Sequence, residues 1–91
     1  MTPRIYREFL IRVICRLYEI CDLSVKCHAQ PNTIARKFPR HLRGLVYEAL
    51  DQLVRKGILY EKHHSKRRRS YGFTPEGVEI ARSILEKCFQ E

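Results

Sequence analysis

The apolar residues of this chain change their spacing at Gly57, and this change limits the folds open to it. Before Gly57 they recur every three or four positions, as along one face of an α-helix. After it, residues 58–62 and 70–74 alternate between apolar and polar positions, which is the pattern of β-strands. Residues 63–69 then predict the loop of a β-hairpin. The pattern indicates a mainly α-helical chain with one small β-hairpin.

Three helical segments precede the hairpin and one follows it. Thr2 and Pro3 predict the start of a helix that extends to residue 21, since proline is well tolerated in a first helical turn. A short second helix starts near Pro31 and is stopped by Pro39, and a third follows at once and ends before the glycine at position 57. Residues 22–30 predict a connection with a short extended piece around residues 24–27.

The last helix has its own start signal. Thr74 is expected to cap a helix whose first turn contains Pro75, and the apolar spacing continues to about Cys88. Gly44 lies inside the third helix, where we expect it to allow close packing against the preceding helix, with close approach of a ligand as the alternative.

Length and composition favour one folded domain, residues 1–91. The chain is 44% apolar, too much for a segment kept disordered by charge. No stretch approaches the roughly 18 uncharged apolar residues of a membrane span, and no secretory leader is recognisable. We therefore expect a cytoplasmic protein without a membrane partner.

Positive charge is concentrated in two short windows. The chain has 18 Lys and Arg against 10 Asp and Glu, a formal net charge of +8. Residues 36–43 hold four of the basic residues and residues 62–69 hold five, and neither window contains an acid. Two such runs on an otherwise nearly neutral chain favour contacts with nucleic acid, and solvated charged faces are the alternative.

Residue sets typical of enzymes are missing from the sequence. It has no paired carboxylates, no Ser/His/Asp set and no glycine-rich phosphate loop. We expect no enzymatic activity, no cofactor and no small-molecule ligand.

The four cysteines, at positions 15, 21, 27 and 88, follow no standard zinc spacing. We favour buried thiols that act as small apolar residues, and we expect no metal site. A disulfide that joins the first helix or its following loop to Cys88, and a metal or redox sensor, are the alternatives.

Two motifs resemble those of winged helix-turn-helix proteins. The first, Leu50-x-x-Leu53-x-x-x-Gly57-Ile58-Leu59, ends a helix and starts the hairpin. The second, Tyr71-x-Phe73-Thr74-x-x-Gly77, ends the hairpin and starts the last helix. Both are similar to motifs of small bacterial and archaeal regulators of the MarR and PadR kind, over about residues 31–80. The resemblance implies a fold in the order helix, helix, helix, strand, strand, helix.

On this plan, residues 31–57 form the helix-turn-helix and residues 58–74 the wing. Residues 1–21 form a first helix and residues 75–90 a C-terminal helix, and both helices are candidates for a dimer interface.

The resemblance also implies double-stranded DNA as a partner, with the recognition helix entering the major groove by its N-terminal residues. We expect the recognition-helix contacts from Arg40, His41, Arg43, Tyr47 and Glu48, with Arg43 and Tyr47 at the bases. Phosphate contacts are expected from Thr33, Arg36 and Lys37. The wing contacts are expected from Lys62, His63, His64, Lys66, Arg67, Arg68 and Arg69.

The first and last helices are apolar over more than one narrow face. We expect the surplus to form the interface of a homodimer, as is common for winged-helix regulators, with completion of the chain's own core as the alternative. The interface residues are expected to be chiefly Tyr6, Ile11, Ile20, Ile80, Ile84, Cys88 and Phe89.

The sequence thus predicts a homodimeric transcriptional regulator that binds specific DNA sequences, from an archaeon, a bacterium or one of their viruses or plasmids. A DNA-coating or plasmid-partition adaptor with weak sequence preference is one alternative. A winged helix that binds protein or RNA is another.

Overall fold

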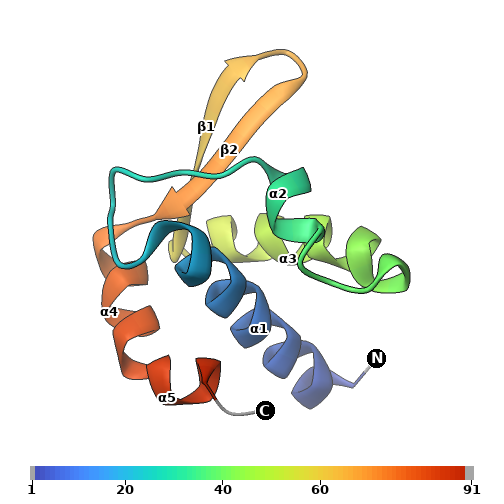
Figure 1. The fold of residues 1–91 in the computed structure, drawn as a ribbon, viewed down its shortest axis with the longest axis vertical. Helices are drawn as coiled ribbons and strands as arrows, with labels where there is room; N and C mark the ends of the chain where they lie inside the picture. Colours follow the sequence, from blue (N-terminus) through green and yellow to red (C-terminus); the bar gives the residue numbers. More distant parts are fainter. Residues whose placement is uncertain (1, 90–91) are drawn as a thin grey trace.

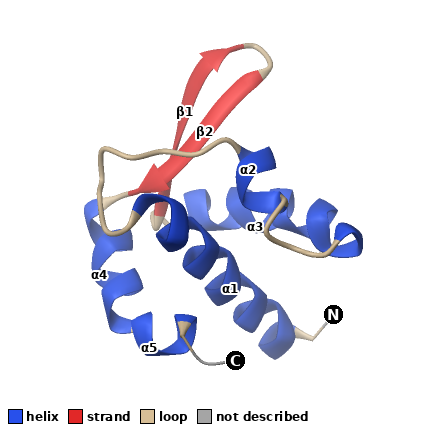
Figure 2. Cartoon of the chain, viewed as in Figure 1, coloured by secondary structure: helices blue, strands red, loops and turns tan. Residues whose placement is uncertain are grey.

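A computed structural model describes residues 2–89 and has the predicted order of elements, with two short additions. The α-helices are α1 (Pro3–Cys21), α2 (Pro31–Ala35), α3 (Arg43–Arg55), α4 (Pro75–Ser83) and α5 (Leu85–Cys88), and a 3₁₀ turn, η1 (Arg40–Leu42), precedes α3. The strands β1 (Leu59–Ser65) and β2 (Arg68–Phe73) pair antiparallel. Figure 1 shows α1 between α3 and the α4–α5 segment, with the hairpin projecting away from the helices. Figure 2 shows both strands of the two-stranded sheet within this hairpin.

The core lies where α1, α2, α3 and the base of the hairpin meet. The first helix begins as predicted, because Thr2 Oγ1 accepts a hydrogen bond from the Ile5 backbone N–H at 3.2 Å. Apolar residues from each of these elements are then removed almost completely from solvent, among them Val13, Leu17, Ile34, Val46, Leu50 and Phe73. Within residues 2–89, no helix is both long and apolar enough to cross a membrane.

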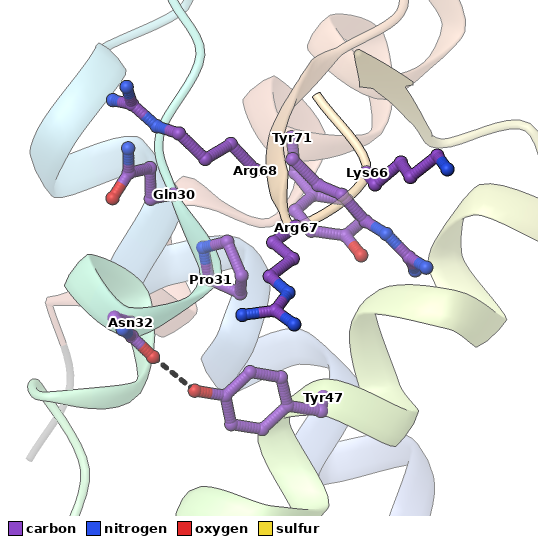
Figure 3. A pocket seen from close by; sticks show the side chains of 9 residues that line it. Gln30, Pro31, Asn32, Tyr47, Lys66, Arg67, Arg68 and Tyr71 are labelled. Carbon is purple, nitrogen blue, oxygen red and sulfur yellow. Dashed lines mark hydrogen bonds between the residues drawn. The ribbon is translucent and has the colours of Figure 1, made fainter. Parts of the chain in front are cut away.

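The segment between α1 and α3 is less helical than predicted. The second helix ends at Ala35, and residues 36–38 form a turn that still buries Phe38. In this turn the Lys37 N–H donates to the Ile34 carbonyl at 3.1 Å and the Phe38 N–H to the Ala35 carbonyl at 3.0 Å, a tighter pattern than that of an α-helix. A hydrogen bond links α2 to α3: the Tyr47 hydroxyl donates to Asn32 Oδ1 (Figure 3).

The wing is longer than the sequence predicted. Its register extends outward to Ser65 opposite Arg68, so only residues 66–67 form the turn, whereas the loop was expected over residues 63–69. The strands tolerate this cationic sequence because alternate side chains point to opposite faces, which separates neighbouring charges.

A third segment joins the wing at its base. Ala29 pairs antiparallel with Tyr71 through two backbone hydrogen bonds of 2.9 and 2.8 Å. The extended piece was expected around residues 24–27, and this was wrong by a few residues. Those residues instead turn over the strands, where Tyr60 donates a hydrogen bond to the Val25 carbonyl at 3.0 Å.

The last helix is interrupted, although one continuous helix to about Cys88 was predicted. The break falls at Ile84, whose backbone is not helical (φ −111°, ψ 9°). Just before it, the Ser83 hydroxyl donates to the Ile80 carbonyl at 2.7 Å. Side chains that bond to the preceding turn in this way compete with the helical ladder and bend helices.

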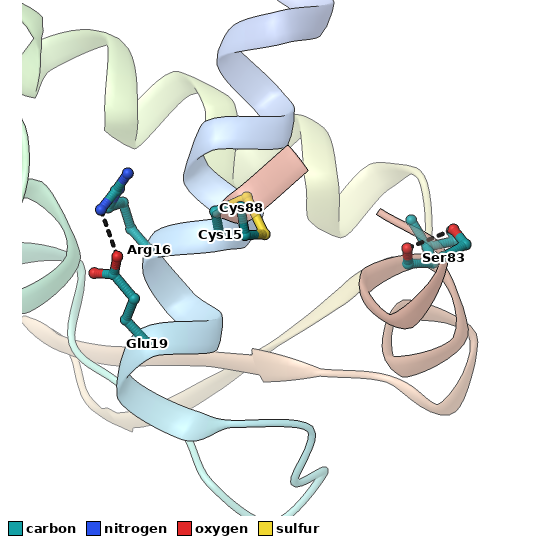
Figure 4. The surroundings of a disulfide bond; sticks show 6 residues. Cys15, Arg16, Glu19, Ser83 and Cys88 are labelled. Carbon is teal, nitrogen blue, oxygen red and sulfur yellow. Dashed lines mark hydrogen bonds and ion pairs between the residues drawn. A yellow bond between two sulfur atoms is a disulfide. The ribbon is translucent and has the colours of Figure 1, made fainter. Parts of the chain in front are cut away.

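The cysteines form two disulfides, so the expectation of buried free thiols was wrong. One bond joins Cys15 of α1 to Cys88 of α5 (Figure 4), and the other joins Cys21 to Cys27. The break before α5 turns the chain back toward α1, and this change of direction cannot be deduced from residue spacing. The first disulfide therefore ties the two ends of the fold together.

Two glycines have opposite surroundings. Gly44 is exposed and has nothing within 4 Å of the position a Cβ would take, so the expected close packing was wrong. At Gly77, by contrast, a Cβ would lie 1.9 Å from the Ile58 carbonyl oxygen. Gly57 has the positive φ of 77° that was expected at the end of α3.

We predict that the two disulfides contribute unequally to stability. Loop-closure entropy grows with the length of the closed loop, and the separations are 73 residues for Cys15–Cys88 and 6 for Cys21–Cys27. Cys88→Ser should lower the free energy of unfolding by about 4 kcal/mol and Cys27→Ser by about 2 kcal/mol. Urea unfolding without reductant measures both, and equal losses would contradict this ranking.

We also predict opposite effects on stability for two matched glycine substitutions, at Gly77 and at Gly44. Gly77→Ala should lower the free energy of unfolding by about 1–3 kcal/mol, because the added methyl group meets backbone. Gly44→Ala should raise it by up to about 1 kcal/mol, because alanine favours the helix and has free space there. Thermal unfolding of the two variants measures both changes in stability. A Gly44→Ala variant less stable than the unaltered protein would contradict the finding that the space around Gly44 is open.

Candidate nucleic-acid interface

A groove of about 450 Å³ runs between the wing and the helix-turn-helix. One wall comes from the start of α2 and from α3, and the other from the tip and second strand of the wing. We call it the basic groove, and its lining residues are Gln30, Pro31, Asn32, Tyr47, Lys66, Arg67, Arg68, Arg69 and Tyr71.

The basic groove combines positive charge with flat aromatic surface. Four of its nine lining residues are Lys or Arg, and none is Asp or Glu. Figure 3 shows Arg67 extending between Pro31 and Tyr47, whereas Arg68 points toward Gln30. Arginine next to an aromatic ring can clamp a phosphate and stack at the same time. The groove is therefore suited to an extended anionic chain.

Tyr47 and Tyr71 lie at the two walls of the basic groove. The Tyr47 side chain is 42% exposed, and its hydroxyl is held by the amide oxygen of Asn32. Tyr71 is nearly buried, and burial followed by the charge of Glu61 raises the pKa of its hydroxyl. The raised pKa keeps the Tyr71 hydroxyl protonated at neutral pH, whereas the Tyr47 hydroxyl already donates its hydrogen to Asn32 and leaves its ring for contact with a ligand.

One carboxylate partly neutralises the wing. Glu61 Oε1 lies 2.7 Å from His63 Nε2 and 3.5 Å from an Arg69 guanidinium nitrogen. Register explains the cluster, because Glu61 stands opposite Tyr71, and His63 opposite Arg69, on the same face of the hairpin. The wing therefore carries fewer free charges than its sequence indicates.

Apart from Tyr47, the predicted recognition-helix residues do not line the basic groove. Arg40 and His41 lie in η1 and are exposed, and Glu48 is exposed on α3. Arg43 is half-buried, because its Nε donates to the Phe38 carbonyl at 3.2 Å. The remaining guanidinium nitrogens of Arg43 are its donors for a ligand.

The expected phosphate contacts differ from one another. Thr33 and Arg36 are exposed on and just after α2. Lys37 pairs with Glu19 of α1 at 3.2 Å, which links the turn after α2 to α1. Thr33, Arg36 and Lys37 do not line the basic groove.

The structure therefore joins only part of the predicted site. It brings Tyr47 together with the wing cations, while residues 36–43 lie outside the groove. Sequence reasoning missed Gln30, Asn32 and Tyr71. The segment from position 30 onward was interpreted only as a helix start, and nothing in its spacing indicates that the wing packs beside it.

The residues expected at a dimer interface also divide into groups. Four of them line an apolar groove of about 400 Å³ between α1, α3 and α4, namely Tyr6, Ile11, Ile80 and Ile84. Ile20 packs against the core. Cys88 is bonded to Cys15 within the chain, so its expected role as a free apolar surface needs correction. Phe89 is 72% exposed and lies edge-on to Tyr18, with 6.1 Å between ring centroids.

Metal-ligand chemistry has little support in the described part of the chain. Within residues 2–89, no three His, Cys, Asp or Glu side chains gather where they could hold a metal ion.

Helices α1 to α3, the two-stranded wing and the following helix define a winged helix-turn-helix protein. The fold class expected from the sequence is confirmed.

Comparisons with protein-family models and with curated proteins found no match. Among solved structures, the chain is similar to the complex structure of hsRosR-S1, an archaeal winged-helix transcription regulator. The TM-score is 0.68 and the identity 25%, and the match covers 89% of this chain and 73% of that chain. This likeness agrees with the winged helix-turn-helix fold and does not distinguish the MarR and PadR groups from other winged-helix regulators.

Proposed function

We propose that this protein binds specific sequences of double-stranded DNA as a transcriptional regulator, and that it does so without enzymatic activity. The observation that carries the proposal is the basic groove, in which wing cations face Tyr47 of the recognition helix with no carboxylate in the lining. The likeness to the transcription regulator RosR-S1 supports the same class.

In this proposal the two basic windows act at separate places on the duplex. The start of α3, with Arg40 and Arg43 near its N-terminal end, enters the major groove and reads base edges. Gly44 supports this placement, because its open surroundings let a backbone approach α3 closely. Arg67 and its neighbours on the wing hold phosphates or enter the adjacent minor groove.

We further propose that two copies pair through the apolar groove. A two-fold axis uses the same surface on both copies, so the surface must complement itself. The groove is lined by Arg7 and Lys56 beside its apolar residues, and Glu76, Glu79 and Glu86 are exposed on α4 and α5. One copy can therefore offer apolar residues and carboxylates to the groove and cations of the other.

The DNA-coating alternative uses the same basic groove but predicts spreading along DNA rather than a discrete site. Footprinting separates the two, because a regulator protects a short palindrome. Binding to RNA or protein is favoured instead if duplex DNA does not compete for the basic groove.

We predict a strongly salt-dependent affinity for duplex DNA. If the wing and helix-turn-helix together neutralise six or more phosphates, raising salt from about 50 to 200 mM should weaken binding roughly 10³-fold or more. Arg67→Ala should weaken binding to all sequences and reduce the salt slope by about 1. Arg4→Ala, which removes the same charge from an exposed position on α1, is the matched control and should change little.

The recognition helix has its own test in a pool of random duplexes. Arg40→Ala combined with Arg43→Ala should abolish the selection of a common sequence that the unaltered protein selects. Unchanged selection by this variant, or salt-independent binding by the unaltered protein, refutes the proposed contacts.

We predict that the protein sediments as a dimer at micromolar concentration, with about twice the chain mass of 10.9 kDa. Ile80→Glu should produce monomers, because it buries a charge in the apolar groove. Val25→Glu is the control, since Val25 is also exposed and apolar but lies in the connection after α1. A monomer in the unaltered protein overturns the dimer.

A further inference from the structure

A second polar pocket lies beside the face of the wing that carries Ser70, and it shares Gln30 and Arg68 with the basic groove. It has a volume of about 300 Å³ and is lined by His28, Gln30, His64, Arg68 and Ser70. We call it the histidine pocket. Its two histidines, and the serine between the wing arginines and Tyr71, take no part in the basic groove.

Strand alternation explains why the wing residues of the histidine pocket meet. Arg68 and Ser70 are two positions apart on β2 and therefore point to the same face. His64 of β1 lies on that face too, because its Nε2 is 2.8 Å from Ser70 Oγ. Ser70 is only 1% exposed, so this contact holds the His64 ring against a buried anchor.

The third segment closes the histidine pocket from the side. Ala29 pairs with Tyr71, so the residues on either side of Ala29 point to the opposite face from Tyr71. These residues are His28 and Gln30, and the face is the one that holds Ser70. His28 and Gln30 lie about 40 positions before Ser70 in the sequence, so no local pattern indicates that they meet.

The histidine pocket gathers donors and positive charge. The rings of His28 and His64 lie 5.3 Å apart, centroid to centroid. Loss of some hydration beside its neighbours, followed by the electrostatic effect of His28, Lys62 and Arg68, lowers the pKa of His64. Beside these stand the Arg68 guanidinium, the Gln30 amide and the Ser70 hydroxyl, and no lining residue is an acid.

This composition favours an anion over a metal ion. Two imidazoles can bind a transition metal, but here the next lining side chain is an arginine, which repels a cation. A tetrahedral oxyanion, by contrast, accepts hydrogen bonds from guanidinium, amide and imidazole N–H groups at once, and its charge relieves the repulsion among them.

We propose that the histidine pocket binds a phosphate group. The group could belong to a DNA backbone or to a free phosphorylated compound, since both present the same oxygens. Binding of inorganic phosphate alone does not depend on the proposed DNA function. A DNA phosphate as the occupant rests on that function.

The test is an NMR titration of the full-length, disulfide-bonded protein with inorganic phosphate, at constant ionic strength maintained with chloride. Imidazole signals of His28 and His64 should shift with a saturable curve, and the midpoint of the His64 pH titration should move to higher pH. The rise follows because a bound anion stabilises the protonated ring. His63, which pairs with Glu61 on the other face, is the internal control and should not respond.

Arg68→Ala should weaken phosphate binding by about tenfold or more, as expected for loss of a charge-assisted hydrogen bond. Arg67→Ala is the matched control, because it removes the same charge from the neighbouring residue and Arg67 does not line the histidine pocket. An unfolded variant is recognised by loss of the dispersed amide spectrum, and Arg68→Lys then replaces it, with the same expected weakening.

Three results overturn the proposal. They are equal shifts of His63 and His64, equal weakening by Arg67→Ala and Arg68→Ala, and binding of Zn²⁺ without any response to phosphate. If the Arg67→Ala variant no longer binds duplex DNA but still binds phosphate, the proposed DNA function and the proposed phosphate site are both supported. If duplex DNA never binds but phosphate does, the proposed function fails and the histidine pocket remains.

Adding duplex DNA to the same titration then shows whether the bound phosphate group belongs to DNA or to a free compound. If DNA shifts His28 and His64 and excludes inorganic phosphate, the occupant is a backbone phosphate. If DNA and phosphate bind together, the pocket takes a free phosphorylated compound. Either result supports phosphate recognition.

Discussion

The fold depends on Thr74, where the recognition helix, the wing and the following helix meet. The Thr74 hydroxyl donates to the Gly57 carbonyl at 2.6 Å and accepts from the Gly77 N–H at 2.9 Å. Its own backbone N–H donates to the Ile58 carbonyl at 3.1 Å. Gly77 permits this approach, because any side chain there would meet Ile58. One residue thereby ends α3, closes the base of the wing and starts α4.

The position of the wing determines what the surface can bind. Its base is anchored at Thr74, and its second strand is held by the pairing of Ala29 with Tyr71. The two faces of the wing consequently acquire different chemistry. One face, with Tyr71, borders the basic groove beside the recognition helix, and the other, with Ser70, closes the histidine pocket. The disulfide between Cys15 and Cys88 secures the opposite end of the molecule.

Local signals were predicted well, because their causes lie within a few residues. The caps at Thr2 and Thr74, the positive φ of Gly57 and the change of period after it all depend on near neighbours. The order of elements followed from them. The extent of the strands did not, because it depends on how cations distribute between two faces and on neutralisation by Glu61. The break at Ile84 was also missed, because the sequence does not show whether the Ser83 hydroxyl bonds to the preceding turn or points to solvent.

The sequence alone determined the winged helix-turn-helix plan, the two basic windows and the surplus of apolar residues on the terminal helices, since periodicity, capping and charge are properties of the chain itself. Only the tertiary structure decided that the wing cations face Tyr47, that all four cysteines pair, and that His28 meets His64. These contacts join residues far apart in the chain. Their geometry follows from packing and strand register, which no local pattern encodes.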